Sequence, residues 1–582
     1  MITRRDLMKM GILGAGGLVL LPSGGGLARV PASFDDNPRS PALQPFVDPL
    51  PVFFSLDELT GVPQFAAADR PAYAAPFFGE GAGGTRCFEI ATRERFVKFH
   101  RDLPETAVWA YVDPNGAPPA DPQRLLTFRV PKVMLGQPAG AGIMIRLINQ
   151  LPTTARDFGF PTVTFHMHGG HQPSPADGFA GDITNRPPDF PAHVVSAPGE
   201  HYDYMYPFRD VGFTLGPGLE GERPSYLWFH DHLLDFTGPN VYRGLASVLP
   251  VFDEIDTGDE NDPSPTALRL PSATPDGVFD LPMVVQDKTF DASGALVFDP
   301  FNQDGFLGDT FVVNGVVQPF HHVKRRKYRM RFLNGSNARI YQMYLTNDVG
   351  QTFPMTQIAT EGGLLARPIP IRSFTLAMAE RVEIVVDFSD PVFAGQHAIY
   401  LENRMAQTDG RKPDGVVGQG PKLVQFLIDD DAVVDNSRVP DTLRPFAPVP
   451  ASDVAAARIR SFKFDRSHGV FTINGSPVDL ERVLAAPSNN RPEVWHLENS
   501  SGGWWHPIHI HSEFMRVLRR NGGRPPLTET DGVAKKDTIL LRGGESVDLF
   551  YRFRDYEGPF VFHCHNIEHE DMAMMGRFDV VS

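Results

Sequence analysis

One short pattern occurs three times in this chain, and it restricts the possible folds more than any other sequence feature. Similar segments occur at IRLINQ (145–150), MRFLNG (330–335) and WHLENS (495–500). A second set follows in the same order: GEHYDYMYPF (199–208), AERVEIVVDF (379–388) and GESVDLFYRF (544–553). The asparagine of each first segment precedes the glutamate of its second segment by a similar interval. Two sets in the same order predict three homologous units.

The composition of the repeated segments indicates the kind of unit. They alternate apolar and polar residues, which is typical of half-buried strands. FVVNGVV (311–317) and FTINGSP (471–477) contain Asn-Gly turns, which predict hairpins at the start of the second and third units. The 54 glycines and 54 prolines among 582 residues favour short strands and turns over long helices. We therefore expect an all-β chain of three β-sandwiches.

Proline-rich stretches predict the limits of these units. Residues 259–277 separate the first unit from the second, and residues 440–453 separate the second from the third. The units are then expected at 85–258, 278–439 and 454–582. Residues 29–84 are expected to form an extended N-terminal arm packed on the first unit.

The N-terminus has the form of an export signal. Arg4 and Arg5 precede an apolar, glycine-rich run that ends near Pro22 and is too short to span a bilayer. The arginine pair is similar to a twin-arginine (Tat) signal, with residues 1–28 removed on export; an ordinary secretory signal is the alternative. We expect the Tat translocase as a partner during export, and a periplasmic or secreted mature protein without a transmembrane segment. The net charge of −16 argues against a nucleic-acid partner.

Four histidine pairs of the form His-X-His stand out among the 19 histidines: His166/His168, His230/His232, His509/His511 and His563/His565. Residues i and i+2 of a strand point to the same face, so each pair offers two neighbouring imidazoles. Neutral imidazole is a common ligand of copper and zinc, and eight of them suit a metal cluster. The pairs occur in the first and third units, whereas residues 340–345 and 398–404 of the second unit carry no histidine at the corresponding places.

Cys564 stands between two of these histidines in the stretch HCHNIEHEDMAMM (563–575). In an extended strand its side chain points away from those of both neighbours, so it is expected to bind a separate metal. A cysteine, two histidines and a weak methionine are the ligands of a blue-copper electron-transfer site. A tetrahedral zinc site is the alternative for the cysteine and histidines alone. The partners expected for Cys564 are His506, His569 and Met574.

The four segments HMHG (166–169), HDH (230–232), HPIHIH (506–511) and HCHNIEHEDMAMM (563–575) resemble the four signatures of the multicopper oxidases, in the order of that family. The resemblance covers the chain from about residue 85 to the C-terminus and is closest to bacterial laccase-like members. It implies three cupredoxin-like Greek-key β-sandwich domains, of which the second is a copper-free spacer. It also implies four copper ions: one type 1, one type 2 and two type 3.

The resemblance assigns a role to each ligand position. The type 1 copper would be bound by His506, Cys564, His569 and Met574, with Met572 and Met575 as rival axial ligands. The type 2 copper would be bound by His166 and His509. The type 3 pair would be bound by His168, His230, His232, His511, His563 and His565.

Two carboxylates also match positions of the family. Asp177 follows the first histidine pair, and Glu570 directly follows His569. Reduction of O2 to water consumes protons as well as electrons, so acids beside the cluster are chemically needed. The resemblance implies that both residues assist proton delivery. For each of them, an ordinary turn or surface carboxylate is the alternative.

The resulting functional expectation is a copper oxidase with O2 as electron acceptor. It would take single electrons from phenols or aromatic amines at the type 1 site and pass them to the cluster through His563 and His565. Oxidation of a metal ion, Cu(I) or Mn(II), is the main alternative electron-donor reaction. A non-enzymatic exported protein that keeps only the fold is a distant alternative, because all the copper-ligand positions are filled.

Overall fold

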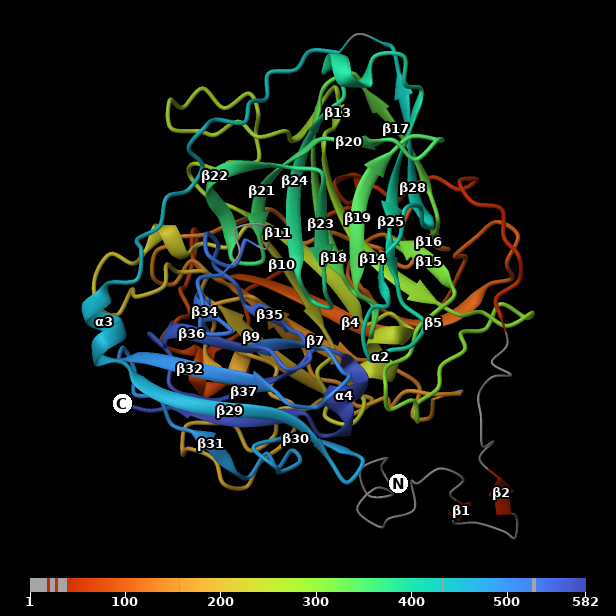
Figure 1. The fold of residues 1–582 in the computed structure, drawn as a ribbon. Helices are drawn as coiled ribbons and strands as arrows, with labels where there is room; N and C mark the ends of the chain where they lie inside the picture. The colour runs from red at the N-terminus through yellow and green to blue at the C-terminus, as the bar shows by residue number, and fades with distance from the viewer. Residues whose placement is uncertain (1–17, 21–26, 30–38, 156, 432, 526–529) are drawn as a thin grey trace.

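The structure is a computed structural model that describes residues 18–20, 27–29, 39–155, 157–431, 433–525 and 530–582. Strands dominate it, and six larger sheets pair into three β-sandwiches of cupredoxin type, as predicted (Figure 1). We refer to the sandwiches as domains 1, 2 and 3. Most of the expected export signal lies outside the described residues; the short strands β1 (Leu18–Leu20) and β2 (Leu27–Arg29) pair with each other.

Domain 1 consists of a five-stranded and a four-stranded sheet. The first contains β3 (Gly61–Val62), β4 (Arg86–Val97), β5 (Thr106–Val112), β7 (Ile143–Asn149) and β9 (His201–Tyr206). The second contains β6 (Val133–Met134), β8 (His166–His168), β10 (Tyr226–His230) and β11 (Ala246–Phe252).

Domain 2 consists of a seven-stranded and a six-stranded sheet. The first contains β14 (Asp280–Lys288), β15 (Thr310–Val313), β16 (Val316–Val317), β18 (Lys327–Asn334), β21 (Met355–Thr360), β22 (Gly363–Ile371) and β24 (Arg381–Asp387). The second contains β17 (Phe320–Lys324), β19 (Tyr341–Thr346), β20 (Thr352–Phe353), β23 (Ser373–Leu376), β25 (Ala398–Asn403) and β28 (Lys422–Asp429).

Domain 3 consists of two five-stranded sheets. The first contains β29 (Arg458–Ser467), β30 (Val470–Ile473), β32 (Pro492–Asn499), β34 (Arg516–Arg520) and β36 (Ser546–Arg552). The second contains β31 (Val483–Ala485), β33 (His506–Ile510), β35 (Thr538–Leu541), β37 (Gly558–Cys564) and β38 (Met575–Val580).

Short helices and small hairpins lie between the strands of the sandwiches. Single 3-10 turns occur at Phe53–Ser55, Ala67–Asp69, Ala72–Ala74, Ser174–Ala176, Glu220–Glu222 and Pro391–Phe393. The α-helices are α2 (Thr237–Arg243), α3 (Ala451–Ala456) and α4 (Ile567–Met572). The two-stranded hairpins are β12 (Ala273–Thr274) with β13 (Gly277–Val278), and β26 (Met405–Ala406) with β27 (Gly415–Val416). In the described part of the chain, we find no helix with the length and apolar character needed to cross a membrane.

The predicted repeat corresponds to one strand arrangement that occurs in all three domains. Strands β7, β18 and β32 each pair in parallel with one neighbour and antiparallel with another (β9, β24 and β36). Each ends in the asparagine of the repeat, whose backbone N–H donates to the carbonyl of the repeated glutamate: Asn149 to Glu200, Asn334 to Glu380 and Asn499 to Glu545. The repeat therefore marks a structurally equivalent corner of each sandwich. The domain limits drawn from the proline-rich stretches stay a prediction.

The expectation of half-buried strands is wrong for domain 2. Strands β18 and β24 are buried on both faces almost throughout. Their polar side chains do not face water, because Arg329 pairs with Asp256 at 2.8 Å and with Glu383 at 2.6 Å, below the surface. Buried ion pairs thus replace solvent on one face of this sheet.

The N-terminal arm does not pack on domain 1 alone. Its strand β3 adds to the edge of β4, as expected. Its earlier part, however, lies against domain 2: the backbone N–H of Leu50 donates to the carbonyl of Phe320, and the side chain of Leu50 joins the core of domain 2. The described arm therefore connects the two domains.

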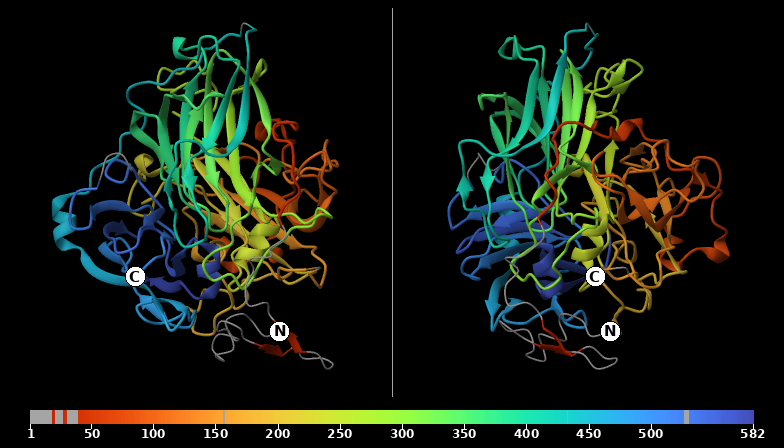
Figure 2. Two further views of the ribbon diagram at one scale, coloured as in Figure 1. Left: turned by 45° about the vertical axis from the view of Figure 1, so that its right-hand side comes forward. Right: turned by 90° about the vertical axis from the view of Figure 1, so that its right-hand side faces the viewer.

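The three domains pack against one another, and a contact between two helices joins domains 1 and 3. Domain 2, in green and cyan, stands above domain 3, in blue, and domain 1, in orange and yellow (Figure 1), and the turned views separate domains 1 and 3 (Figure 2). Helices α2 and α4 lie against each other at the boundary of domains 1 and 3. Asp571 of α4 accepts hydrogen bonds from the backbone N–H groups of Thr237 and Gly238 at the start of α2. This contact fixes the two histidine-bearing domains relative to each other.

Candidate metal centre

Strand pairing places the histidine pairs side by side within each domain. In domain 1, β8 and β10 are antiparallel and His166 lies opposite His230. In domain 3, β33 and β37 are antiparallel and His509 lies opposite His563. Because side chains of alternate residues share a face, all four pairs point out of their sheets toward one region.

The two domains bring these faces together. The rings of His166 and His511 stack at 3.9 Å between centroids, and those of His168 and His509 stack at 3.7 Å, so each stack joins domain 1 to domain 3. His563 Nε2 lies 3.1 Å from His232 Nε2 and 3.3 Å from His511 Nε2. All eight predicted histidines are therefore gathered in one buried cluster. Their ring nitrogens or ring contacts connect His166, His168, His230, His232, His509, His511, His563 and His565.

The orientation of several rings leaves one nitrogen pointing into the cluster. His166, His230 and His509 donate Nδ1–H to backbone carbonyls at 2.5, 2.7 and 2.8 Å. Their Nε2 atoms find no hydrogen-bond partner among the described residues, and neither nitrogen of His565 finds one. Buried polar atoms are normally satisfied, so this set of free imidazole nitrogens fits metal ions.

Burial keeps these rings in the form that binds metal. Loss of solvent lowers the pKa of His230 to about 3 and that of His232 to about 4. It also holds the pKa values of His166, His509 and His565 well below the usual range, with further lowering by neighbouring histidines. Neutral imidazole has the lone pair that a metal ion needs.

Three carboxylates surround the cluster, and each lies beside two histidines. Asp177 accepts from His511 Nδ1 at 2.6 Å, and its backbone carbonyl accepts from His166. Glu570 lies 2.9 Å from His563 Nδ1 and 3.8 Å from His232 Nδ1. Both residues that the resemblance selected are therefore buried at the cluster rather than placed in surface turns.

The two predicted carboxylates differ in their electrostatic surroundings. Burial raises the pKa of Asp177 well above its usual value, and a hydrogen bond from Gln172 opposes this only in part. Burial also disfavours the charged form of Glu570, but His563 and His232 outweigh it and hold the pKa of Glu570 at about 2. One carboxyl is thus suited to carry a proton and the other to remain ionised.

The third carboxylate, Asp537, was missed by the sequence analysis. Its Oδ1 accepts from His168 Nε2 at 3.2 Å, and its backbone carbonyl accepts from His509 Nδ1 at 2.8 Å. It stands just before β35 in KKDT, where no motif or spacing distinguishes it from other aspartates. Its proximity to His168 depends on residues far apart in the chain.

A second group forms around Cys564, on the other side of strand β37. Cys564 Sγ lies 3.3 Å from His506 Nδ1 and 3.6 Å from His569 Nδ1, and the two histidine nitrogens are 3.1 Å apart. All three side chains are fully buried. Burial raises the pKa of the Cys564 thiol well above its usual value, so a bound cation would be needed to hold the thiolate.

Three methionines follow this group, and the structure separates one of them from the others. Met574 packs in the same apolar cluster as Cys564, and so does Met572. Met575 packs in a different cluster, with Val561 and Phe179. The backbone N–H of Cys564 also donates to the carbonyl of Met574 at 3.0 Å, which holds that residue beside the group.

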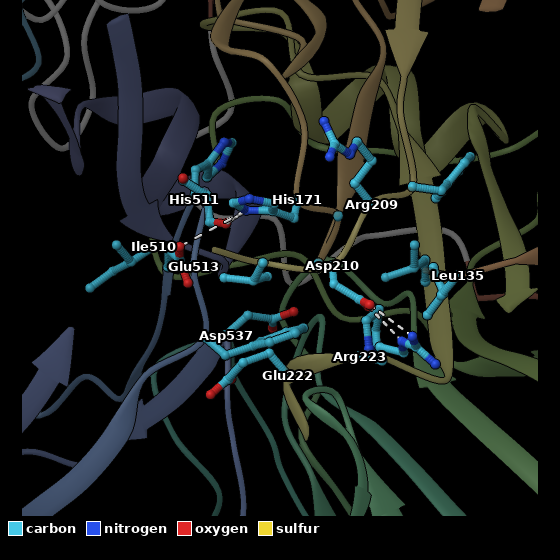
Figure 3. Close-up of a pocket in the computed structure, with 18 of the residues that line it drawn as sticks. Leu135, His171, Arg209, Asp210, Glu222, Arg223, Ile510, His511, Glu513 and Asp537 are labelled. Carbon is cyan, nitrogen blue, oxygen red and sulfur yellow. Dashed lines mark hydrogen bonds and ion pairs between the residues drawn. The ribbon is translucent and has the colours of Figure 1, made fainter. Parts of the chain in front are cut away.

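A cavity borders the histidine cluster (Figure 3). It offers about 40 Å³ to water-sized molecules, and His166, His509 and His511 form part of its wall. Further along, Asp210 and Arg223 form an ion pair that also lines it. This space is sufficient for a few water molecules, or a molecule of similar size, to reach the cluster.

Known proteins resemble this chain over most of its length. A model of the multicopper oxidase family matches residues 449–582. A bilirubin oxidase of Albifimbria verrucaria is 34% identical over 463 residues, which are 78% of this chain and 70% of that protein. A laccase of Bacillus stratosphericus is 30% identical over 546 residues, which are 85% of this chain and 94% of that protein.

A solved structure shares the fold. The crystal structure of a multicopper oxidase from the hyperthermophile Aquifex aeolicus superposes with a TM-score of 0.66 at 26% sequence identity. The match covers 86% of this chain and 98% of that one. The three-domain arrangement is therefore shared nearly in full.

Proposed function

Because this chain belongs to the multicopper oxidase family, whose members are copper-dependent oxidoreductases that use O2, we propose that it is a laccase-like enzyme that oxidises phenols or aromatic amines. The observation that carries the proposal is the position of Cys564 between two groups. Its thiol faces His506 and His569, while the side chain of the preceding residue, His563, enters the histidine cluster. One peptide link therefore connects an electron-accepting site to the cluster.

The ligand roles implied by the resemblance are part of this proposal. His506, Cys564, His569 and Met574 would hold a type 1 copper, and the eight clustered histidines would hold one type 2 and two type 3 coppers. The number of four ions is supported by the free nitrogens of the cluster and by the separate Cys564 group. Copper, when bound, supplies one-electron redox chemistry and a site for O2 reduction.

The protein's own groups manage protons around that chemistry. Reduction of one O2 to two waters takes up four electrons and four protons. Asp177 contacts His511 and Glu570 contacts His563, so both carboxyl groups lie next to the cluster interior. Their opposite pKa shifts support a division of labour, in which Asp177 carries a proton that it can donate, whereas Glu570 stays ionised and attracts protons toward the cluster.

The surface outside His569 supports an organic electron donor. His569 Nε2 lies 3.3 Å from the backbone carbonyl of Asp304, which separates it from solvent. The Asp304 carboxylate already accepts from Trp504 Nε1 at 3.0 Å and pairs with Arg411 at 3.0 Å. This carboxylate is thus engaged, and the indole of Trp504 and the guanidinium of Arg411 suit an aromatic donor better than a metal cation.

The test is oxygen uptake by the copper-loaded protein with a phenol, Cu(I) and Mn(II) measured side by side. Rapid uptake with the phenol and weak uptake with both metal ions is the expected result. Uptake dominated by Cu(I) or Mn(II) would make the protein a metal-ion oxidase. No uptake with any donor, in protein that holds copper, would contradict the oxidase assignment.

Export by the twin-arginine route to the periplasm or outside the cell is a further part of the proposal, supported by Arg4 and Arg5. The double variant Arg4→Lys, Arg5→Lys keeps the positive charge but removes the arginine pair. It should accumulate unprocessed inside the cell, whereas the wild type is processed and exported. Equal export of both would favour an ordinary secretory signal.

A further inference from the structure

We propose that Arg381, from the domain expected to be only a spacer, positions Asp537 and through it His168 and His509. Arg381 begins strand β24 of domain 2, and Asp537 precedes β35 of domain 3. The inference rests on the copper cluster of the proposed function. Domain 2 would then help to orient the ligands of the copper cluster, although the ligand histidines themselves belong to domains 1 and 3.

The guanidinium of Arg381 is fully buried, and all five of its N–H groups have partners. Nε donates to the carbonyl of Tyr226 at 3.1 Å, and the terminal nitrogens donate to the carbonyls of Ala379 at 3.0 Å and Glu361 at 3.3 Å. The remaining two bonds go to both carboxylate oxygens of Asp537, at 3.0 and 2.6 Å. One side chain thus joins domain 1, domain 2 and domain 3, with a planar fork that lysine does not possess.

Asp537 transmits this constraint to two histidines. Its carboxylate accepts from Nε2 of His168, which leaves Nδ1 of that ring without a partner among the described residues. Its backbone carbonyl accepts from Nδ1 of His509, which leaves Nε2. These two hydrogen bonds therefore decide which nitrogen each ring presents to a metal, and the two rings stack within 14° of parallel.

A neighbouring glycine provides independent evidence, because it leaves space for the ion pair of Arg381 and Asp537. Gly169, in HMHG, has a φ of +81°. A Cβ on it would lie 2.4 Å from a terminal nitrogen of Arg381 and 2.8 Å from an Asp537 carboxylate oxygen. The glycine that follows the first histidine pair therefore leaves room for the pair, besides adopting a backbone conformation that other residues disfavour.

The internal repeat shows what is particular to domain 2. The residue after the repeated glutamate is His201 in domain 1, Arg381 in domain 2 and Ser546 in domain 3. His201 is exposed and Ser546 is half-buried, whereas Arg381 is fully buried. At equivalent positions, the domain without the histidine pairs thus carries the cation that holds Asp537.

The experiment compares copper-loaded full-length wild type with Arg381→Lys, Arg381→Met and Asp537→Asn. The measurements are copper per chain, the blue absorption band, and the electron paramagnetic resonance signals of type 1 and type 2 copper. We expect the blue band to remain, because His506, Cys564 and His569 all lie in domain 3. We expect the copper held by His509 (type 2) and by His168 (type 3) to be retained roughly 10–100-fold less tightly against a chelator in all three variants.

A matched control separates positioning from general loss of stability. Arg331 is equally buried in the same sheet and pairs with Asp280 at 2.7 Å, but it does not contact Asp537 in the described structure. Arg331→Lys should lower the thermal midpoint and keep the type 2 signal. The proposal is overturned if Arg331→Lys loses that signal to the same extent, or if the Arg381 and Asp537 variants keep it.

The same samples also distinguish a folding failure of the variants from a failure of the proposed function. If the Arg381 variants fail to fold, as judged by loss of the blue band as well, Asp537→Asn decides the question, because it keeps the side-chain shape. If the wild type itself takes up no copper, the proposed function fails, and the inference about Arg381 fails with it. A wild type with full copper and unaffected variants overturns the inference alone.

Discussion

Sγ of Cys564 lies 3.3 Å from Nδ1 of His506, and both residues belong to one sheet of domain 3. The contact therefore does not depend on docking of domain 1, unlike the stacked histidines of the cluster. It also places the thiol in a fully buried site where only a cation would keep it ionised.

Cys564→Ser should remove the blue absorption band and abolish oxygen uptake, while the protein stays folded. The serine hydroxyl does not replace the cysteine thiolate as a ligand of a blue copper ion. Cys87→Ser is the matched control, because Cys87 is equally buried but packs among apolar residues of domain 1. It should cost about 1–3 kcal/mol of stability and leave the band unchanged. A colourless but fully active Cys564→Ser enzyme would contradict the assignment.

Glu570→Gln should slow O2 reduction by roughly 10²–10⁴-fold, while reduction of the blue site by a donor stays fast. The substitution keeps the shape but removes the charge beside His563 and His232. Stopped-flow reduction and reoxidation measure the two steps separately. Glu568→Gln, in the same helix, replaces a buried carboxylate that accepts from Asn337 at 2.7 Å, and it should affect reoxidation far less. Equal effects of the two substitutions would count against a proton role for Glu570.

Asn334→Ala should lower the stability of the protein by roughly 2–4 kcal/mol. The Asn334 amide donates to the carbonyls of Arg339 and Leu376, and its oxygen accepts from the N–H of Ser336, all in the interior of domain 2. Without it, these backbone groups lose their partners. Asn436→Ala, at an exposed position, should change stability by no more than about 0.5 kcal/mol. Thermal midpoints provide the measurement, and similar shifts for both variants would contradict the prediction.

Lys288→Met should change the pH dependence of stability. Burial lowers the pKa of Lys288 to about 7, and the nearby Asp287 opposes this only partly. The unfolded chain, with a lysine pKa of about 10.4, therefore binds this proton more tightly than the folded protein. Stability of the wild type should rise between about pH 7 and pH 10 through this group.

The methionine variant lacks that contribution. Its advantage over the wild type should be largest below pH 7 and shrink as the pH rises toward 10. The loss of the Lys288 hydrogen bond to the carbonyl of Tyr242, at 2.6 Å, should lower the variant's stability by a similar amount at every pH. Thermal midpoints of both proteins at several pH values measure the difference, and parallel curves would exclude the proposed titration.

The sequence by itself determined the parts of the protein that depend on local geometry. A His-X-His pair in a strand places both rings on one face, and Cys564 between two histidines must point to the other face. The threefold repeat likewise specified equivalent corners at Asn149, Asn334 and Asn499, because their hydrogen bonds reach along the same strand arrangement in each domain. Fold class, the pairing of the histidines within each domain and the separate Cys564 group all follow from such short-range rules.

Only the tertiary structure decided how the cluster is surrounded. Asp537 and His168 are 369 residues apart in the chain, and their contact exists because three domains pack together. The role of Arg381 could not be predicted from the sequence for the same reason. An arginine at the start of a strand is usually solvated, whereas this one is buried. Periodicity also misjudged β18 and β24, because it records which residues are polar and not whether ion pairs or water satisfy them. Side chains that act across domain boundaries leave no spacing in the sequence, so their roles depend on how the folded domains meet.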